Sequence, residues 1–183
     1  MSGFEGRHVV IVGGGFAGLG CAQRLAKHDD VRVTLIDRNN YHQFQPLLYQ
    51  VATSQLAPSD IAHSLRSVFA DQKNVDVKLA EISEVDVATR TVTSTDGERW
   101  EADVLVLAAG SQPNFFGTPG AAESSFPLYS LDDATRLRSR ILGIFEQVDR
   151  DPKLIERGAL NFVIVGGGPT GVEVAGRLRT CSR

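Results

Sequence analysis

Three glycines near the N-terminus have the spacing of a turn that binds a diphosphate. Gly13, Gly15 and Gly18 follow a run of β-branched residues and precede a helical pattern, and in that context G-x-G-x-x-G indicates a nucleotide site. The first glycine allows the tight turn, the second lets the diphosphate approach the backbone, and the third lets helix and strand pack closely. Unpaired amides and the positive end of the helix then face the phosphates. The candidate binding residues of this turn are Gly13, Gly14, Gly15, Phe16, Ala17 and Gly18.

An acidic residue completes this candidate site. Asp37 lies about 20 residues after Gly18, where a carboxylate can accept hydrogen bonds from both hydroxyls of an adenosine ribose. In the plainer alternative, the glycines serve only a tight turn and Asp37 caps a strand. The strand, turn, helix and acid are all in register, so we favour nucleotide binding. Arg38 is either a surface charge or a guanidinium that stacks on the adenine.

A second copy of the motif occurs near the C-terminus. The sequence VIVGGG occurs at Val10–Gly15 and again at Val163–Gly168, and Gly166, Gly168 and Gly171 repeat the glycine spacing. The ribose-binding acid of this copy and the strand that completes its crossover would lie beyond the last residue. We therefore expect this sequence to be the front part of a longer protein with two nucleotide sites.

The segments around the first motif predict a parallel α/β fold. His8–Val12 is a short β-branched run suited to a strand buried on both faces. Phe16–Lys27 has apolar residues at helical spacing, and Val31–Ile36 alternates like the next strand. This order predicts a right-handed βαβ crossover and hence a Rossmann-like domain. The run Val104–Gly110 is expected to be a further buried strand.

The remaining segments predict further helices and one small antiparallel sheet. Asn39–Pro58 indicates a loop with a short helix, and Ile61–Ala70 has its apolar residues on one helical face. Leu131–Arg150 is expected to be an amphipathic helix capped by Ser130. An antiparallel meander with a tight turn at Asp96–Gly97 is expected within the Rossmann-like domain. Its predicted strands are Glu84–Val87, Thr91–Thr95 and Arg99–Val104.

Composition argues against several other classes of protein. The net charge is −3 and the basic residues are scattered, so no nucleic-acid surface is expected. Cys21 and Cys181 are too far apart in sequence for a dithiol motif or a zinc site. We therefore expect no metal, and both cysteines are expected to pack as small apolar side chains on helices. The most apolar run, Val104–Ala109, is much shorter than the roughly 20 residues that cross a bilayer. These features fit a cytoplasmic protein.

Longer segments of the chain resemble one family of flavoproteins. Two glycine motifs with a β-meander between them resemble the two-dinucleotide flavoprotein superfamily, in which the first site binds FAD and the second binds NAD(P)H. Within it, Asp37–Leu56, Leu105–Gly117 and Gly166–Glu173 resemble type II NADH:quinone dehydrogenases. The resemblance covers nearly the whole chain but less than half of such an enzyme. It implies that NADH or NADPH passes hydride to FAD and that electrons then pass to a quinone.

The same resemblance implies further cofactor contacts. His42 by itself would more often be a hydrogen-bonded loop histidine, but it lies in a segment that resembles the flavin-side loop of the family. Ala109 stands where the family often has a threonine, so a hydroxyl contact near the flavin is lost. Besides the first glycine turn, the implied FAD contacts are Asp37, Arg38, His42, the backbone of Ile82, and Ala109.

Glu173 is expected in the first turn of the helix that follows the second glycine motif, where the first copy has Gly20. The helix dipole stabilises an acid there by about 0.3–1 kcal/mol, which explains the residue without any catalytic role. The resemblance instead places Glu173 near the flavin and the quinone, where it assists proton transfer or quinone positioning. The resemblance also implies that NAD(P)H binds at Gly166, Gly168 and Gly171.

The expected organisation has three parts. An FAD-binding domain spans residues 6–118, a connecting segment with the amphipathic helix spans 119–158, and the start of an NAD(P)H-binding domain spans 159–183. Membrane-binding helices of the family would follow these residues. Peripheral attachment to the inner face of a membrane is therefore expected only for a full-length protein, and a homodimer is compatible with the resemblance.

Two alternatives to a quinone reductase remain open. One is another reductase on the same scaffold, for example one that reduces ferredoxin or rubredoxin. The other is a catalytically inactive FAD-binding fragment, because a lone βα unit cannot bury the apolar faces of Val163–Val165. We expect this chain alone to oxidise little NADH, and its preference between NADH and NADPH is open.

Overall fold

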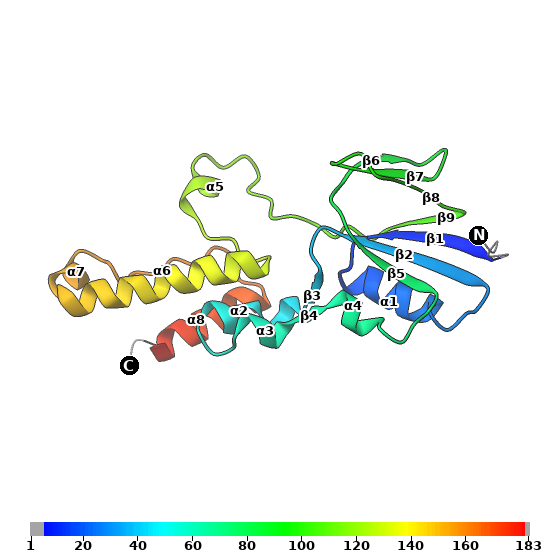
Figure 1. The fold of residues 1–183 in the computed structure, drawn as a ribbon. Coiled ribbons are helices and arrows are strands. Elements are labelled where there is room, and N and C mark those ends of the chain that lie inside the picture. The colour runs from blue at the N-terminus through cyan, green and yellow to red at the C-terminus, as the bar shows by residue number, and fades with distance from the viewer. Residues whose placement is uncertain (1–5, 182–183) are drawn as a thin grey trace. The chain divides into compact units, whose positions relative to one another are not determined.

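The computed structural model describes residues 6–181, which form two compact units. The first unit contains the chain up to His42 together with His63–Ser111 (Figure 1). The second contains Gln43–Ala62 together with the chain from Gln112 onward. The loop after His42 therefore belongs with later residues rather than with the strands that precede it. The functional boundaries expected after residues 118 and 158 concern ligand binding rather than compactness, and they stay a proposal.

The first unit is built on a four-stranded sheet with the strand order β5-β2-β1-β9. β1 (Arg7–Val12) and β2 (Val31–Asp37) are parallel neighbours, and α1 (Phe16–Leu25) connects them. β5 (Val75–Leu79) and β9 (Val104–Leu107) form the two edges and are also parallel to their neighbours. The Rossmann-like prediction is therefore confirmed, since a strand, glycine turn, helix and parallel strand follow in the expected order.

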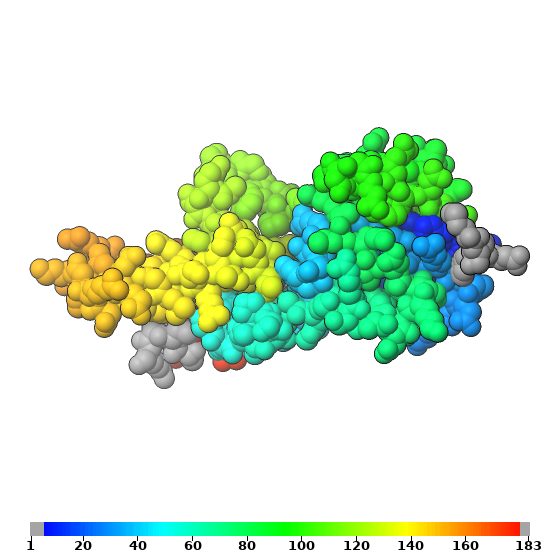
Figure 2. Space-filling model, viewed as in Figure 1, coloured from blue at the N-terminus to red at the C-terminus, as the bar shows by residue number. Residues whose placement is uncertain are grey.

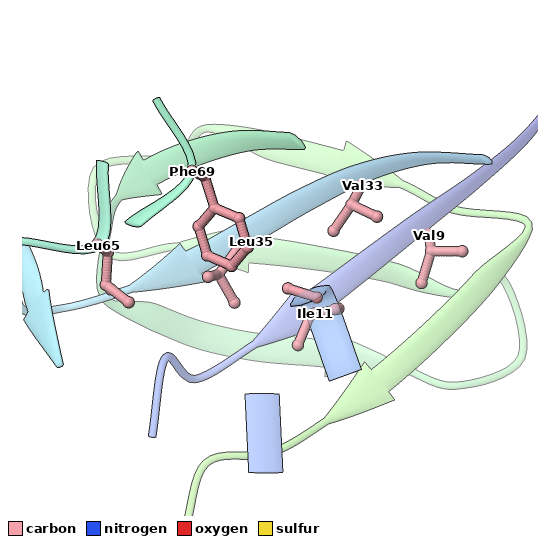
Figure 3. Close-up of a cluster of buried hydrophobic side chains, with 7 residues drawn as sticks. Val9, Ile11, Val33, Leu35, Leu65 and Phe69 are labelled. Atoms are coloured by element: carbon pink, nitrogen blue, oxygen red, sulfur yellow. The ribbon is translucent and has the colours of Figure 1, made fainter. Parts of the chain in front are cut away.

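Successive residues of the central strands point to opposite faces of the sheet. On one face, β1 and β2 pack against α1 and the segment around α4 (Leu65–Val68), as Figure 3 shows. Burying each Val or Leu side chain stabilises the fold by about 1.5–3 kcal/mol. Cys21 packs at the border of this cluster, as predicted, whereas the side chain of Cys181 lies outside the described residues. The buried members are Val9, Ile11, Ala22, Val33, Leu35, Leu65 and Phe69.

The other face of the sheet is covered by an antiparallel meander. Val10 and Ile36 of the sheet pack against Val92 and Trp100 of the meander. In the space-filling view, the green meander lies directly over the blue strands (Figure 2). The meander was predicted, and its strands pair in sequence order: β6 (Ile82–Asp86), β7 (Thr91–Ser94) and β8 (Arg99–Glu101).

The second unit is mainly helical. Its longest element, α6 (Leu131–Arg150), has 20 residues and is therefore about 30 Å long. The apolar core lies where α2 meets α6, with Leu48, Val51, Ala52, Ile61 and Ala134 buried. The shorter helices are η1 (Gln45–Leu47), α2 (Leu48–Ala52), α3 (Pro58–Ile61), α5 (Ala121–Ser124), α7 (Lys153–Glu156) and α8 (Pro169–Cys181).

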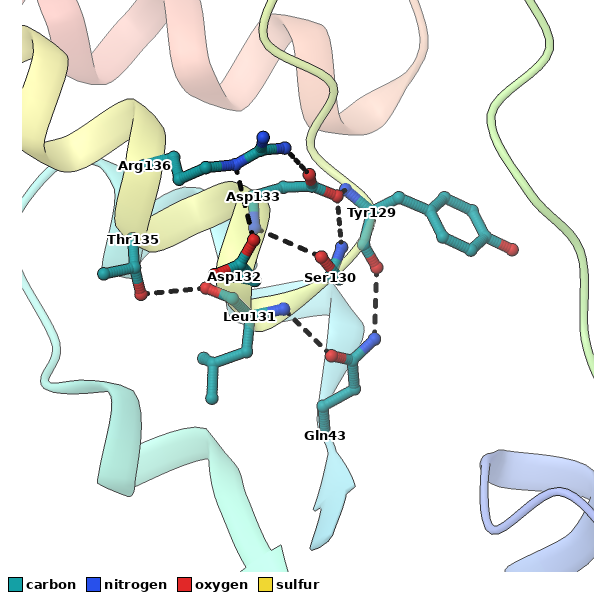
Figure 4. A network of polar contacts seen from close by, with 8 residues as sticks. All are labelled: Gln43, Tyr129, Ser130, Leu131, Asp132, Asp133, Thr135 and Arg136. Atoms are coloured by element: carbon teal, nitrogen blue, oxygen red, sulfur yellow. Dashed lines mark hydrogen bonds and ion pairs between the residues drawn. The ribbon is translucent and has the colours of Figure 1, made fainter. Parts of the chain in front are cut away.

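The predicted cap of the long helix α6 is confirmed. Ser130 Oγ accepts a hydrogen bond from the Asp133 amide at 3.1 Å, and the Asp133 carboxylate accepts one from the Ser130 amide at 3.0 Å. Arg136 pairs with the same carboxylate at 2.6 Å (Figure 4). Partial burial alone would raise the pKa of Asp133. The hydrogen bonds from Ser130, Arg136 and the Tyr129 amide outweigh it and hold that pKa below its ordinary value.

A side chain from the preceding loop completes this helix start. The Gln43 side chain donates to the Tyr129 carbonyl at 3.1 Å and accepts from the Leu131 amide at 3.0 Å. The amide of Leu131 is one of the groups that an α-helix leaves unsatisfied at its N-terminus. Gln43 therefore fastens the loop segment to α6 within the second unit (Figure 4).

The single helix predicted at Ile61–Ala70 is wrong. Ile61 is buried in the core of the second unit, whereas Leu65 is buried in the core of the first. The helical spacing of these residues therefore arises from two separate cores. The residues between Ile61 and Leu65 form the short strand β4 (Ala62–Ser64), which separates the helices α3 and α4. β4 pairs with β3 (Tyr41–Gln43), which lies earlier in the chain.

Two predicted strands differ from the structure, the first in its burial and the second in its formation. β9 forms within Val104–Gly110, but it is an edge strand, and Val104 and Leu107 are exposed. In the second copy of the motif α8 forms, but the segment before it is not assigned as a strand. Val163 is 88% exposed and Val165 is 95% exposed. Apolar residues alone do not make a strand here, because within residues 6–181 no strand pairs with this segment to supply hydrogen bonds.

Candidate nucleotide-binding site

The first glycine turn has a backbone that only glycines can form. Gly13 has a φ of +104°, and a Cβ atom there would lie 2.3 Å from the Ala108 carbonyl oxygen at the end of β9. A Cβ on Gly18 would lie 1.8 Å from the Gly13 carbonyl oxygen. Both contacts are far inside van der Waals distance, so the first and third glycines of the motif have the steric roles predicted for them.

The second glycine of the motif has a different surrounding. An added Cβ on Gly15 would meet no atom within 4 Å. Gly15 is also the N-cap of α1, and no side chain caps that helix end. The first amides of an α-helix have no partner within the helix, and no side chain supplies one at this N-cap. This open space beside uncapped amides suits an anion such as a diphosphate.

Asp37 lies against the glycine turn from the end of β2. Its Oδ2 accepts a hydrogen bond from the Gly14 amide at 2.5 Å, and its Oδ1 accepts one from the Asn39 amide at 2.6 Å. A carboxylate has about four acceptor positions, so each oxygen can accept one further hydrogen bond. The structure thus orients Asp37 at the nucleotide turn, while its contact with a ribose stays a prediction.

His42 is buried against the other side of the same turn and is only 7% exposed. Its Nδ1 donates to the Gly14 carbonyl oxygen at 3.0 Å, and because a carbonyl only accepts, this nitrogen carries a proton. The imidazole also meets the Phe16 ring edge-on, with ring centres 5.1 Å apart. Of the two ring nitrogens of His42, Nδ1 is therefore already engaged by the protein.

The other residues assigned to this site lie near the carboxyl ends of β2 and β9. Ala109 follows Ala108, whose carbonyl contacts Gly13. The Asp37 carbonyl accepts a hydrogen bond from the Ala80 amide at 3.0 Å, which places the chain entering β6 at Ile82 beside β2. Arg38 is exposed next to Asp37. Their contacts with a cofactor are not tested by this geometry and stay predictions.

The second glycine turn repeats the backbone of the first. Gly166 has a φ of +114°, and a Cβ on Gly171 would lie 2.1 Å from the Gly166 carbonyl oxygen. Gly168 has no atom within 4 Å of an added Cβ. Glu173 is exposed on α8, but it lies beyond the first turn of that helix, so the position expected for it in the first turn is wrong.

Two contacts at the first turn were not predicted. Leu65 covers Gly14, where an added Cβ would lie 2.6 Å from the Leu65 Cδ1, and the Asn39 amide holds Asp37. Gly14 was a sequence signal for the Leu65 contact. The motif itself requires glycine only at Gly13, Gly15 and Gly18, so a further glycine indicates a close approach by another residue. The partner of that close approach could not be named, since the segment around Leu65 had been assigned to one continuous helix.

Within residues 6–181, the structure brings together no group of three His, Cys, Asp or Glu side chains that could hold a metal ion. Among the helices of the described chain, none is long and apolar enough to cross a bilayer.

Known proteins share this chain's sequence pattern and fold. Residues 7–183 match the family of pyridine nucleotide-disulphide oxidoreductases. The type II NADH:quinone oxidoreductase NdhA of Mycobacterium tuberculosis is 46% identical over 182 residues, which are 97% of this chain and 38% of that protein. An Arabidopsis thaliana protein, external alternative NAD(P)H-ubiquinone oxidoreductase B2 of mitochondria, is 33% identical, over 97% of this chain and 32% of its own length.

The fold is shared with a solved structure as well. NDH2 from Plasmodium falciparum, solved in complex with RYL-552, superposes with a TM-score of 0.81 at 25% sequence identity. The match covers 94% of this chain and 36% of that one. This chain therefore spans between about a third and two fifths of the length of these relatives.

Proposed function

This chain belongs to the pyridine nucleotide-disulphide oxidoreductase family. We propose that its first unit binds FAD and that the chain is the N-terminal part of an NADH:quinone oxidoreductase. The observation that carries the proposal is the open first glycine turn beside the uncapped start of α1. The similarity to type II NADH:quinone oxidoreductases supports the choice of cofactor and reaction. Bound FAD would supply the group that accepts hydride from a nicotinamide and passes electrons to an acceptor.

Each residue at the turn has a proposed task. The Gly15 amide at the start of α1 holds the diphosphate, because Gly15 faces open space and no side chain caps this helix end. Asp37 accepts the ribose hydroxyls with the acceptor positions that Gly14 and Asn39 leave free. Arg38 stacks on the adenine. Ile82, which begins β6, and Ala109, which follows β9, contact the cofactor near the carboxyl ends of β2 and β9.

The second glycine turn is proposed to bind NADH or NADPH. Its support is the repeated backbone conformation at Gly166 and Gly171. Glu173 is proposed to assist proton transfer or quinone positioning. By function, residues 6–118 would be the FAD-binding domain, 119–158 the connection and 159–183 the start of the NAD(P)H-binding domain. Homodimer formation belongs to the same proposal and is tested by light scattering. Attachment to a membrane surface is proposed only for a full-length protein, and vesicle co-sedimentation of that protein would test it.

The proposal is tested by FAD binding to the 183-residue chain. We expect the purified protein to bind FAD, to show the flavin absorption band and to oxidise little NADH by itself. Gly15→Val should keep the fold, since its side chain enters open space, but it should abolish FAD binding by filling the diphosphate position. Gly20→Val is the matched control, because Gly20 lies on α1 with equally open surroundings.

The two variants separate the proposal from a loss of folding. Isothermal titration calorimetry with FAD gives the affinity, and circular dichroism gives the stability of each variant. If the wild-type chain binds no FAD, or if Gly15→Val binds it as tightly as Gly20→Val does, the first turn is not a flavin site.

A further inference from the structure

The peptide groups of the first glycine turn are held by side chains from two other segments. The Asp37 carboxylate accepts from the Gly14 amide, and the His42 imidazole donates to the Gly14 carbonyl. Gly14 is thus held at both of its backbone polar groups. Gly14 also has no room for a side chain, since an added Cβ would lie 2.6 Å from the Leu65 Cδ1.

Peptide planarity passes this hold on to the next residue. In a trans peptide the carbonyl of one residue and the amide N–H of the next point in opposite directions. When His42 holds the Gly14 carbonyl on its own side, the Gly15 N–H must point away from His42. Gly15 is exposed, and its amide donates to no other group within the described part of the chain.

We propose that His42 is a positioning residue for the diphosphate, acting through Gly14 rather than by touching the flavin. The imidazole sets the orientation of the Gly14–Gly15 peptide, and that peptide presents the Gly15 N–H to the phosphate. This inference rests on the proposed FAD function, and it changes the role that the family resemblance implied for His42. The 7% exposure of His42 supports it, since little of the side chain is left to contact a ligand.

The two roles of His42 predict different ligand dependence. FAD contains an ADP moiety, so ADP carries the same diphosphate and ribose without the flavin. A residue that touches the flavin affects FAD binding and leaves ADP binding unchanged. A residue that positions the Gly15 amide affects both ligands, but it leaves the binding of adenosine, which has no phosphate, unchanged.

The experiment compares ADP, FAD and adenosine binding to the 183-residue chain and to three variants. His42→Leu removes the hydrogen-bond donor, and we expect ADP and FAD to bind about 10- to 100-fold more weakly, because hydrogen bonds to charged groups have this strength. His42→Asn places an amide donor where Nδ1 lies and should restore most of the affinity. His63→Leu is the matched control, since His63 is an exposed histidine of the same unit.

Nuclear magnetic resonance of the labelled chain adds a readout that a general loss of stability would not produce. ADP should shift the Gly15 amide resonance in the wild type and in His42→Asn, but not in His42→Leu. Trp100, the one tryptophan of the sequence, is buried in the same unit and reports by its fluorescence whether each variant is folded.

The outcomes distinguish this inference from the proposed function. If His42→Leu weakens only FAD, or weakens adenosine as much as ADP, the positioning role is wrong while the FAD site stands. If the wild type binds ADP but not FAD, the FAD function fails, and the His42 role is decided by ADP alone. If the wild type binds none of the phosphate ligands, both proposals are overturned.

Discussion

The two glycine turns have nearly the same backbone but lie in different surroundings. The first glycine of each has a positive φ, +104° at Gly13 and +114° at Gly166. A Cβ on the third glycine would strike the carbonyl of the first in both turns, at 1.8 Å for Gly18 and 2.1 Å for Gly171. The local sequence therefore sets the turn itself, whether or not the preceding segment is part of a sheet.

Only the first turn has a scaffold around it. Gly13 lies against β9, whereas a Cβ on Gly166 would meet no atom within 4 Å. Asp37 and His42 hydrogen-bond to Gly14, and among the described residues no side chain does the same for the second turn. A glycine motif thus needs neighbouring strands before its peptide groups are held in one orientation. This contrast supports placing the cofactor site at the first turn.

The largest expected effect comes from filling the third glycine of each turn. Gly18→Ala should lower the free energy of unfolding by about 3 kcal/mol or more, because the new methyl group overpacks a buried turn within the sheet. Gly171→Ala should cost less than about 1 kcal/mol, since its turn follows an unpaired segment that can shift and alanine favours the helix. Urea unfolding followed by far-UV circular dichroism measures both changes.

Trp100 fluorescence provides the control for this pair, because it reports on the first unit. Gly18→Ala should move the fluorescence transition to lower urea concentration, and Gly171→Ala should leave it in place. Equal losses at the two positions would mean that the turns are equally constrained, and the contrast between them would be wrong.

A smaller effect is expected at the matched strand positions of the repeat. Val10 is fully buried and Val163 is 88% exposed, although both begin the sequence VIVGGG. Val10→Ala should lower the free energy of unfolding by about 2 kcal/mol through lost burial. Val163→Ala should change it by less than about 0.5 kcal/mol, as exposed positions do. The same urea titration measures both, and a large effect at Val163 would show that this segment is buried in solution.

The parts of the fold predicted from sequence are those decided within a short segment. The β-branched run of β1, the alternation of β2, the glycine turn and the Ser130 cap depend on residues close in sequence, and the elements predicted from them are confirmed. The meander was also predicted, since its tight turns and alternating residues are local features.

The errors arise where distant partners decide the structure. Ile61 and Leu65 have helical spacing but belong to separate cores, and no single-segment pattern shows which core a residue joins. Val163–Val165 has strand composition and no strand beside it. At the site, Asp37 was predicted from its position after the motif, whereas the bond from His42 to Gly14 joins residues 28 positions apart and could not be deduced from spacing.

The smallest predicted effect concerns the N-terminal cap of α6, the long helix of the second unit. Ser130 and Asp133 form this cap, and the pKa of Asp133 is lower in the folded state than in the unfolded chain. A lowered pKa means that the stabilisation is complete above a pH of about 4. It is lost as the pH falls through the pKa of the folded state. We expect the cap to contribute about 1 kcal/mol, measured as loss of helical circular dichroism on acid titration.

The neighbouring aspartate separates the cap from general acid effects. Asp132 pairs with Arg136 at 3.4 Å, but its side chain is 80% exposed, so this ion pair contributes little to stability. Asp133→Asn should remove most of the pH dependence of the α6 signal, whereas Asp132→Asn should leave it in place. The Trp100 signal should not follow the Asp133 titration, because that residue belongs to the other unit. If both aspartate variants show the same pH dependence of the α6 signal, the cap does not stabilise α6. The contrast in which a sheet orders the first unit and a helix cap orders α6 of the second would then be wrong.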